Sequence, residues 1–268
     1  MKTLGAFLER VVARRRSDVT AAYGSLTAAD LERLACCGRI ARDFSGALTD
    51  RDDVAVIAEV KKASPSAGPI APDAEAAKQA AHYVAGGAAA VSVLTEPAFF
   101  AGSYTDLSDV ADAVAVPVLA KDFIVDTAQL FVARGHGADA VLLIVRVLED
   151  ELEPYLDIAA TLGLQALVEV HDRQELLRAR RAGATLVGVN SRDLMTLRVD
   201  RQAALAIVSE AAASGLTVVA ESGVRGRAQV ESAAAAGAHA VLVGETLMRA
   251  PRPEEVLEGL TGVRARLE

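Results

Sequence analysis

GADAVLLI, residues 137–144, places a glycine and an alanine directly before a run of apolar residues. The same Gly-Ala-x-x-Val pattern occurs four times in the chain, beginning at Gly87, Gly137, Gly183 and Gly237. Successive starting positions differ by 50, 46 and 54 residues (137 − 87, 183 − 137 and 237 − 183). Each glycine follows an alanine-rich segment and precedes a short apolar run. This arrangement is typical of a helix that ends at the glycine and leads into a buried strand.

A second set of apolar runs alternates with the first along the chain. Its members are VAVIAEV (54–60), VPVLAKD (116–122), QALVEV (165–170) and TVVAES (217–222). Short, nearly continuous apolar runs separated by helical segments are typical of parallel strands that are buried on both faces. Two strands in each of four periods predict roughly eight βα units and therefore a (β/α)8 TIM barrel. An open, doubly wound sheet is the alternative, but the even repetition favours a closed barrel.

The composition indicates one large globular α/β domain. A chain of 268 residues with 52% hydrophobic and 24% charged residues can bury a substantial core. The formal net charge of −8 argues against nucleic acid or an anionic membrane as a partner, whereas a small anionic molecule fits a local basic site. The two cysteines, Cys36 and Cys37, are adjacent and have no histidine at metal-ligand spacing, which suits a reducing compartment and predicts no metal site.

The N-terminal region predicts an extension to the barrel. Residues 4–16 and 26–44 read as two additional helices, and we expect them to cap one end of the barrel. Thr27 followed by Asp30 predicts a capping box at the start of the second helix. Glu9 and a basic run stand where a signal peptide would need an apolar core, so we expect a cytoplasmic protein. With no linker in the sequence, residues 1–268 are expected to form one domain, of which about 1–50 is the helical extension.

Charged residues lie at the carboxyl ends of the odd-numbered predicted strands. The first strand ends with Glu59 and Lys61, and the third, fifth and seventh end with Lys121, Glu169 and Glu221. Side chains two positions apart in a strand point to the same side, and inward residues of alternate barrel strands lie in common layers. We therefore expect these five side chains to converge at the mouth of the barrel. Lysines among carboxylates in a confined site form a plausible acid–base set, because burial and opposite charges shift their pKa values.

The last two units predict a binding site for an anion. The loops ESGVRGR (221–227) and VGETLM (243–248) carry Gly223 and Gly244, whose backbone amides can approach a phosphate at the start of a helix. Barrels often hold a phosphate at this position. Arg192, after the sixth strand, is a candidate for a charge-assisted contact to the same anion.

Several motifs together resemble a known family, indole-3-glycerol phosphate synthase. These motifs are, in order, IAEVKKASPSAG, AVSVLTEPAFFAGSYTDL, PVLAKDFIVD, ADAVLLI, LVEVH, GVNSRDL, VAESGV and VLVGETLM. The similarity covers residues from about 54 to 250. It implies a (β/α)8 barrel that closes the indole ring of 1-(2-carboxyphenylamino)-1-deoxy-D-ribulose 5-phosphate with release of carbon dioxide and water, in tryptophan biosynthesis. It also implies that no metal or organic cofactor is used, and that the substrate is a small phosphorylated molecule.

The resemblance assigns roles to the charged and polar residues. Lys121 resembles the general acid that protonates the substrate ketone, and Lys61 the lysine that pairs with the substrate carboxylate. Glu169 resembles the general base, and Glu59 the carboxylate that orients Lys121. Positions that hydrogen-bond the sugar chain correspond to Asn190, Glu221 and Ser222. Positions around the phosphate correspond to Ser64, Arg192, Gly223 and Gly244.

The same resemblance implies an apolar wall around the anthranilate ring. Its members here are Pro65, Phe100, Phe123, Leu142 and Leu194. The chain departs from the common family pattern at three places: Ala67 replaces a frequent lysine, Ala120 a frequent arginine, and Met195 a residue that is often polar or charged. None of these departures removes a predicted catalytic group.

Two other functions are weighed against the synthase. A related barrel isomerase of the phosphoribosylanthranilate isomerase kind would require a cysteine base at the first strand, where this chain has Glu59 and Lys61. A non-catalytic metabolite-binding barrel would be expected to lose one of the lysines or glutamates, yet all are present. Among the histidines, His171 follows the fifth strand without a ligand partner at a useful spacing, and His82, His136 and His239 are expected at surface or core positions.

Overall fold

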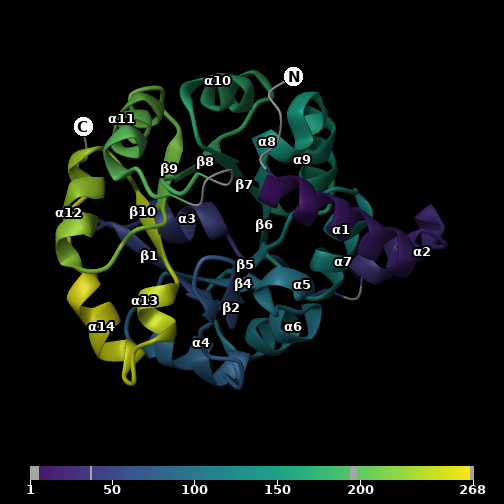
Figure 1. Ribbon diagram of the computed structural model, residues 1–268, viewed down its shortest axis with the longest axis horizontal. Helices are drawn as coiled ribbons and strands as arrows, with labels where there is room; N and C mark the ends of the chain where they lie inside the picture. The colour runs from purple at the N-terminus through teal and green to yellow at the C-terminus, as the bar shows by residue number, and fades with distance from the viewer. Residues whose placement is uncertain (1–5, 37, 194–197, 266–268) are drawn as a thin grey trace.

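Eight parallel strands close into a barrel ringed by helices in the computed structural model, which describes residues 6–36, 38–193 and 198–265 (Figure 1). The hydrogen-bonded order is β1-β10-β9-β8-β7-β6-β5-β4, and β4 pairs again with β1. The predicted TIM barrel is therefore confirmed and the open sheet is excluded. The strands are β1 (Ala55–Val60), β4 (Ala90–Leu94), β5 (Val118–Lys121), β6 (Ala140–Ile144), β7 (Gln165–Val170), β8 (Leu186–Asn190), β9 (Thr217–Glu221) and β10 (Ala240–Val243).

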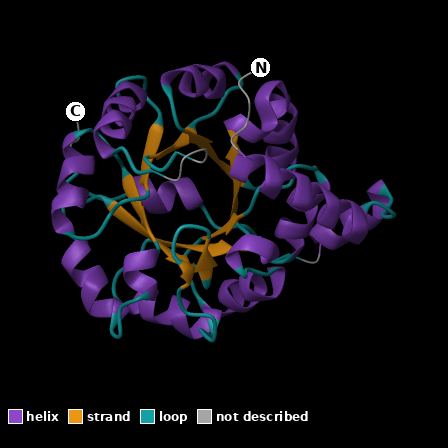
Figure 2. Cartoon of the chain, viewed as in Figure 1, coloured by secondary structure: helices purple, strands orange, loops and turns teal. Residues whose placement is uncertain are grey.

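Helices follow the strands and cover the outside of the barrel, as Figure 2 shows. The longer ones are α4 (Ala76–Ala85), α6 (Tyr104–Ala113), α7 (Ala128–Gly135), α9 (Leu152–Thr161), α10 (Arg173–Arg181), α11 (Arg201–Ala212), α12 (Arg227–Ala235) and α14 (Pro253–Leu260). Short elements lie in the loops: α5 (Pro97–Phe100), α8 (Val145–Leu148), the 3-10 turn η1 (Glu149–Glu151), α13 (Glu245–Met248), and a small antiparallel pair of β2 (Ala63–Ser64) with β3 (Gly68–Pro69).

The repeated glycines end helices in the way that the sequence predicts. Gly87, Gly137, Gly183 and Gly237 have φ values of 92°, 84°, 88° and 92°, a left-handed conformation that a side chain would strain. After each glycine, the next amide donates to the carbonyl five residues earlier, as in Ala138 to Ala133 at 3.0 Å. This bond satisfies a carbonyl of the last helical turn and directs the chain into the following strand.

Residues at every second position of the strands fill the inside of the barrel. Ala55 and Ile57 of β1, Leu119 of β5, Leu167 of β7 and Val219 of β9 are buried there in one apolar cluster. Two positions after the last of these apolar residues, each strand carries a charged residue that points the same way: Glu59 in β1, Lys121 in β5, Glu169 in β7 and Glu221 in β9. The charged residues therefore form the layer above the apolar core, at the carboxyl ends of the strands. Residues of the opposite parity, such as Val56 and Val168, pack under the helices in a second core.

The N-terminal segment differs from its prediction, because it contains three helices rather than two: α1 (Ala6–Tyr23), α2 (Ala28–Cys36) and α3 (Phe44–Thr49). Only α3 lies across the amino-terminal end of the barrel, within the ring of strands in Figure 2. It buries Phe44 and Leu48 against the first inward residues of the strands. By contrast, α2 packs on α7 outside the barrel. The predicted capping box is confirmed, since the Asp30 amide donates to Thr27 Oγ1 at 3.2 Å and the Thr27 amide donates to Asp30 Oδ2 at 2.9 Å.

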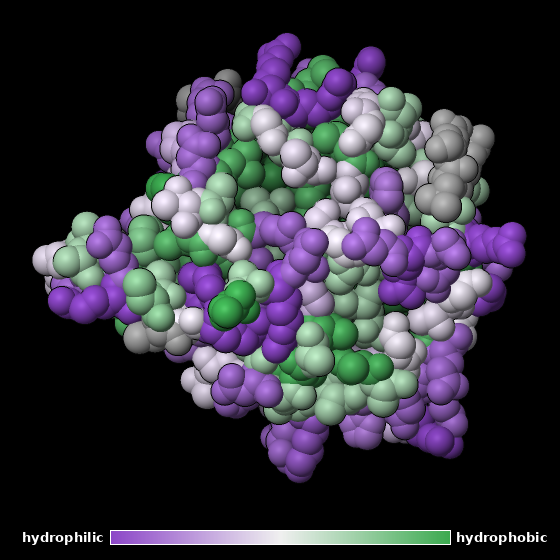
Figure 3. Space-filling view, turned by 180° about the vertical axis from the view of Figure 1, so that it is seen from behind, coloured by the Kyte–Doolittle hydropathy of each residue, from purple (hydrophilic) through white to green (hydrophobic). Residues whose placement is uncertain are grey.

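Within the described ranges, no helix has the length and apolar character to cross a bilayer. Figure 3 shows the face turned away from the viewer of Figure 1, on which hydrophilic and apolar side chains are interspersed. Cys36 is exposed at the end of α2, and Cys37 lies outside the described residues.

A buried ion pair fastens α1 to the barrel next to the mouth. Arg15 is 4% exposed and donates to both oxygens of Asp122, at 2.8 and 2.6 Å. Asp122 follows Lys121 directly, and it also accepts from Thr95 Oγ1 at 2.8 Å and from the Phe123 amide at 2.8 Å. Four donors thus satisfy a carboxylate that is 2% exposed. Removing the guanidinium would leave a buried charge without its counter-ion.

We predict that Arg15→Met lowers the free energy of unfolding by about 3–5 kcal/mol, because it strands the Asp122 carboxylate in the core. The matched control is Arg14→Met. Arg14 pairs with Asp18 on the surface of the same helix, at 2.8 Å and with 61% of its side chain exposed, so we expect a change within about 0.5 kcal/mol. Denaturant unfolding of the three proteins measures both values. Equal stabilities for the two variants would contradict a stabilising role of the buried pair.

Candidate active site

A cavity of about 640 Å³ opens at the carboxyl ends of the strands. Every predicted site residue within the described part of the chain lines it, whereas Leu194 lies outside the described residues, as does Met195. The lining residues that were predicted are Glu59, Lys61, Ser64, Pro65, Phe100, Lys121, Phe123, Leu142, Glu169, Asn190, Arg192, Glu221, Ser222, Gly223 and Gly244. The inward parity of the strand ends accounts for the convergence of the charged residues, and the loops that follow the strands supply most of the others.

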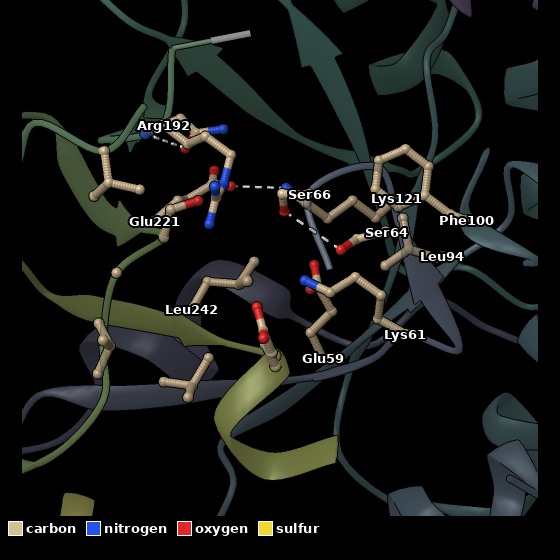
Figure 4. A pocket seen from close by; sticks show the side chains of 18 of the residues that line it. Glu59, Lys61, Ser64, Ser66, Leu94, Phe100, Lys121, Arg192, Glu221 and Leu242 are labelled. Carbon is tan, nitrogen blue, oxygen red and sulfur yellow. Dashed lines mark hydrogen bonds and ion pairs between the residues drawn. The ribbon is translucent and has the colours of Figure 1, made fainter. Parts of the chain in front are cut away.

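Two carboxylates hold Lys121 at the centre of the site, and Figure 4 shows its side chain extending toward Glu221. Its Nζ lies 2.7 Å from Glu221 Oε2 and 3.4 Å from Glu169 Oε2. Both glutamates are 2% exposed, and the Lys121 side chain is 14% exposed. The ammonium group is therefore fixed in position and largely removed from water, with one face left toward the cavity.

Burial and charge shift the pKa values of these three groups in different directions. Burial alone would lower the pKa of Lys121, but the carboxylates of Glu221, Glu169 and Glu59 outweigh it and raise that pKa well above its usual range. Burial raises the pKa of Glu221, and Lys121 offsets this only in part. For Glu169, Lys121 and His171 overcome the effect of burial and lower the pKa. The two carboxylates are thus unequal, and Glu169 is the one that stays ionised.

Lys61 and Glu59 form a second ion pair at the end of β1. Lys61 Nζ donates to Glu59 Oε2 at 2.5 Å, and Glu59 is 2% exposed. Among the described residues, Glu221 and Glu169 make the hydrogen bonds to Lys121, so the orienting role of Glu59 stays a prediction. Glu59 acts on Lys121 only through its charge. The sequence predicted that the three glutamates converge with the lysines at the barrel mouth. It did not show which glutamates pair with Lys121 and which one pairs with Lys61.

The predicted phosphate loops lie together on the far side of the cavity. Ser222 and Gly223 both have a left-handed backbone, with φ of 67° and 77°. Gly244 precedes the four-residue helix α13, and a Cβ at this position would overlap Glu59 Oε2. Gly244 is therefore needed to make room for Glu59, a requirement that the phosphate interpretation did not include. The Arg192 amide donates to Asn190 Oδ1 at 3.0 Å and joins the ends of β8 and its loop.

Further basic residues line the same part of the cavity and were not predicted. They are Arg201, Arg225 and Arg249, which come from the loops and helices after β8, β9 and β10. Arg201 donates to the carbonyl of Gly223 at 3.3 Å. Their positive charge is appropriate for an anionic ligand in a chain of negative net charge. The sequence signal was present as arginines 11, 4 and 6 residues after the three strands (201 − 190, 225 − 221 and 249 − 243), but most arginines in such segments face solvent.

The apolar wall surrounds the opposite side of the cavity. The rings of Phe100 and Phe123 lie 6.0 Å apart at 39°, and Leu142 lies beside them in the cavity lining. Additional apolar residues that the sequence analysis missed are Phe7, Leu94, Ile144 and Leu242. Phe7 belongs to α1, so the N-terminal extension contributes directly to the cavity. An aromatic ring of the substrate would be covered on this side.

His171 has carboxylate partners that the sequence analysis did not foresee. Its Nε2 lies 3.3 Å from Glu169 Oε1, and its Nδ1 lies 3.1 Å from Glu175 Oε2. Burial would lower the pKa of His171, but Glu169 and Glu175 outweigh it and raise that pKa to about 9. Glu175 lies on α10, four residues further along the chain. Within the described ranges, no group of three or more histidine, cysteine, aspartate or glutamate side chains is arranged to hold a metal ion.

The comparisons with known proteins agree with this geometry. The family model described as indole-3-glycerol phosphate synthase matches residues 8–260. The chain belongs to the indole-3-glycerol phosphate synthase family. Relatives named indole-3-glycerol phosphate synthase include those of Mycobacterium tuberculosis (strain ATCC 25618 / H37Rv), 46% identical, and Mycobacterium avium (strain 104), 45% identical. Each alignment spans 254 residues, 94% of this chain and 93% of the relative.

A solved structure supports the same fold at greater distance. Thiamine phosphate pyrophosphorylase from Pyrococcus furiosus superposes with a TM-score of 0.58 at 17% identity, over 81% of this chain and 96% of that chain. At this identity the similarity concerns the barrel alone. The family assignment therefore rests on the sequence relatives, and the arrangement of side chains comes from the structure of this chain.

Gly188 of β8 keeps the space that Glu221 needs in this family member. A Cβ on Gly188 would overlap Glu221 Oε1, lie 3.1 Å from Glu221 Cδ and lie 3.3 Å from Leu167 Cδ1. Because Glu221 also holds Lys121 at 2.7 Å, a side chain at position 188 would push on the central ion pair. The buried surroundings leave little room for relaxation.

We predict that Gly188→Ala lowers the free energy of unfolding by about 1–3 kcal/mol, because the added methyl overpacks a buried charged layer. Gly259→Ala is the control. Gly259 lies in α14 with open space around a Cβ, so the alanine is expected to raise the free energy of unfolding by up to about 1 kcal/mol. Unfolding in denaturant measures both changes. If both variants are stabilised alike, the close approach of Glu221 to Gly188 does not constrain the site.

Proposed function

We propose that this chain closes the indole ring of 1-(2-carboxyphenylamino)-1-deoxy-D-ribulose 5-phosphate and releases indole-3-glycerol phosphate, carbon dioxide and water. The observation that carries the proposal is a protonated lysine, Lys121, held between two buried carboxylates and facing a cavity that has an apolar wall on one side and arginines on the other. Such a cavity suits a ligand with an aromatic ring at one end and a phosphate at the other. The family membership supports the same reaction.

Lys121 is proposed as the general acid of the first step. The ring carbon that bears the carboxylate attacks the ketone carbon, and the ketone oxygen takes a proton from Lys121 as its double bond opens. Loss of carbon dioxide then returns the electron pair to the ring and restores its aromaticity. Glu221 and Glu169 support this role, because they fix the ammonium group in a site shielded from water, where a charged donor acts most strongly.

Lys61 is proposed to hold the substrate carboxylate. Its charge is balanced by Glu59 at 2.5 Å. A ligand carboxylate would share this ammonium group and lie next to the apolar wall formed by Phe100 and Phe123. Lys61 is also a candidate donor for the hydroxyl that leaves as water.

Glu169 is proposed as the base that takes a proton from the carbon attached to the ring nitrogen, which completes the indole double bond. The reaction delivers two protons, one to the ketone oxygen and one to the departing hydroxyl, and removes one from carbon. Lys121 is the main charge that lowers the pKa of Glu169. Once Lys121 has given up its proton, the pKa of Glu169 rises, so Glu169 becomes a stronger base when one is needed.

The remaining predicted residues are proposed to bind the sugar chain and the phosphate. Asn190 and Glu221 end β8 and β9, Ser222 begins the loop after β9, and all three line the cavity. Gly223 lies in the loop after β9, and Gly244 directly follows β10. Ser64 and Arg192 lie on opposite sides of the cavity in Figure 4. Arg201, Arg225 and Arg249 add positive charge around the proposed phosphate position.

A cysteine-dependent isomerase receives no support from the site. Cys36 is exposed at the end of α2 and is not among the residues that line the cavity. The position that such a base would occupy at the first strand is taken by the ion pair of Glu59 with Lys61.

The direct test is a fluorescence assay with the carboxyphenylamino deoxyribulose phosphate as substrate. The chain contains no tryptophan and four tyrosines, so an indole product is expected to appear as new emission over a low background. Release of carbon dioxide at the same rate would identify ring closure rather than isomerisation. Substrate that binds without producing an indole signal would favour a non-catalytic barrel.

We further predict that the two lysines separate by kinetics. Lys121→Met is expected to lower kcat by about 10²–10⁴-fold with little change in substrate affinity, because a general acid acts mainly in the transition state. Lys61→Met is expected to weaken substrate binding as well, because it removes the partner of the substrate carboxylate. Equilibrium binding and single-turnover rates at several pH values measure both effects. Near-normal ring closure by the Lys121→Met protein would assign the proton to Lys61 or Glu169 instead.

A further inference from the structure

A line of alternating charges runs from the cavity into the shell of helices. It begins with Lys121 and Glu169 in the barrel mouth and continues through His171 to Glu175 on α10 and Arg146 on α8. The successive separations are 3.4, 3.3, 3.1 and 2.6 Å. Side-chain exposure along this line is between 3% and 14%. Buried charges of this kind require partners on each side, and here each cation lies between carboxylates.

We propose that His171 is a positioning residue for Glu169, which it holds in the carboxylate form and in a fixed orientation next to Lys121. His171 does not line the cavity, so it acts through Glu169 and not on the substrate. The inference rests on the proposed role of Glu169 as the base. It adds a residue that the reaction requires, although this residue does not touch the substrate.

The position of the imidazole is fixed from its far side. Glu175 Oε2 accepts from the His171 backbone amide at 2.8 Å and lies 3.1 Å from Nδ1 of the same residue. The other oxygen of Glu175 accepts from Arg146 Nε at 2.6 Å. A carboxylate held in this way makes Nδ1 the donor, and the ring then directs Nε2 toward Glu169. The start of α10, where the Asp172 side chain accepts from the Glu175 amide at 2.9 Å, sets the place of Glu175 itself.

The contact to Glu169 is an ion pair rather than a tight hydrogen bond. Nε2 is shielded from solvent, lies 3.3 Å from Glu169 Oε1 and has no hydrogen bond of ordinary geometry among the described residues. The charged groups facing His171 are Glu169 from β7 and Glu175 from α10. Arg146 from α8 lies behind Glu175, with Asp172 and Asp193 3.7 and 3.9 Å from its guanidinium.

The charge on His171 matters most after Lys121 has given up its proton. At that moment the ammonium charge next to Glu169 is gone, and the imidazolium becomes the cation in contact with it. The raised pKa of His171, about 9, means that the ring is protonated at neutral pH. A cation on the far side of Glu169 favours its carboxylate form until the proton from the substrate carbon arrives. Without it, Glu169 would compete with the departing hydroxyl for a proton.

The test compares His171→Gln and His171→Ala with the wild-type chain. The glutamine keeps a donor amide but removes the charge, and the alanine removes both. We expect kcat to fall by about 10–100-fold in His171→Gln and further in His171→Ala, with KM within about twofold. The acid limb of the kcat–pH profile is expected to move to higher pH in both variants, because Glu169 has lost a neighbouring cation. His82→Gln, an exposed histidine on α4, is the control and is expected to match the wild type.

A second measurement does not depend on turnover. Nuclear magnetic resonance of the imidazole nitrogens is expected to show a His171 that is doubly protonated at pH 7.5 in the wild type and titrates near pH 9, and whose pKa falls toward 6.5 in Glu175→Gln. This measurement keeps the inference testable if a His171 variant does not fold. A wild-type His171 that titrates below pH 7 would overturn it.

The outcomes also separate this inference from the proposed function. If the wild-type chain gives no indole product, the proposed function fails, and the base role of Glu169 fails with it. If the wild type turns over while His171→Gln keeps both kcat and the acid limb of the wild type, only the role of His171 is refuted. A lower kcat with an unchanged acid limb would make His171 a structural residue and would likewise refute its role as a positioning group.

Discussion

The sharing of Lys121 by two buried carboxylates is the interaction on which the site depends. One ammonium group serves Glu221 at 2.7 Å and Glu169 at 3.4 Å, and without its charge neither carboxylate would have a close counter-ion on this side of the buried layer. Neighbouring residues keep Lys121 and its two carboxylates in place. Gly188 leaves space for Glu221, and His171 approaches Glu169 from outside the cavity. The acid–base chemistry proposed for the site then follows from how a proton on Lys121 changes the pKa of each glutamate.

Closure of the barrel is what brings these charges together. Glu59, Lys121, Glu169 and Glu221 come from alternate strands, β1, β5, β7 and β9, and each follows an apolar inward residue by two positions. In an open sheet, alternate strands would hold the four side chains in a row about 10 Å apart. In the closed barrel they point toward a common axis, which turns a row of charges into a cluster. The apolar layer below excludes water from beneath the cluster.

What could be predicted from the sequence depended on local periodicity. The glycine repeat located the strands, and the two-residue period of a strand predicted Glu59, Lys121, Glu169 and Glu221 on the inside. Local periodicity could not predict which charged side chains pair with one another. The choice of Glu221 over Glu59 as partner of Lys121 depends on stagger between strands, and the contact of His171 with Glu175 depends on how α10 starts. The third N-terminal helix, α3, is six residues long and has too little periodicity to be recognised.

The bond between Arg15 and Asp122 has a consequence for the order in which the molecule assembles. The two residues are 107 positions apart, so α1 cannot make this contact until β5 has been synthesised. Barrel closure comes later still, because β1 pairs with β10, which begins at Ala240. Contacts between such distant segments slow folding, since loop-closure entropy is lost before the contacts form. The cavity, with Phe7 on α1 and Gly244 after β10 in its wall, is therefore among the last parts of the protein to become complete.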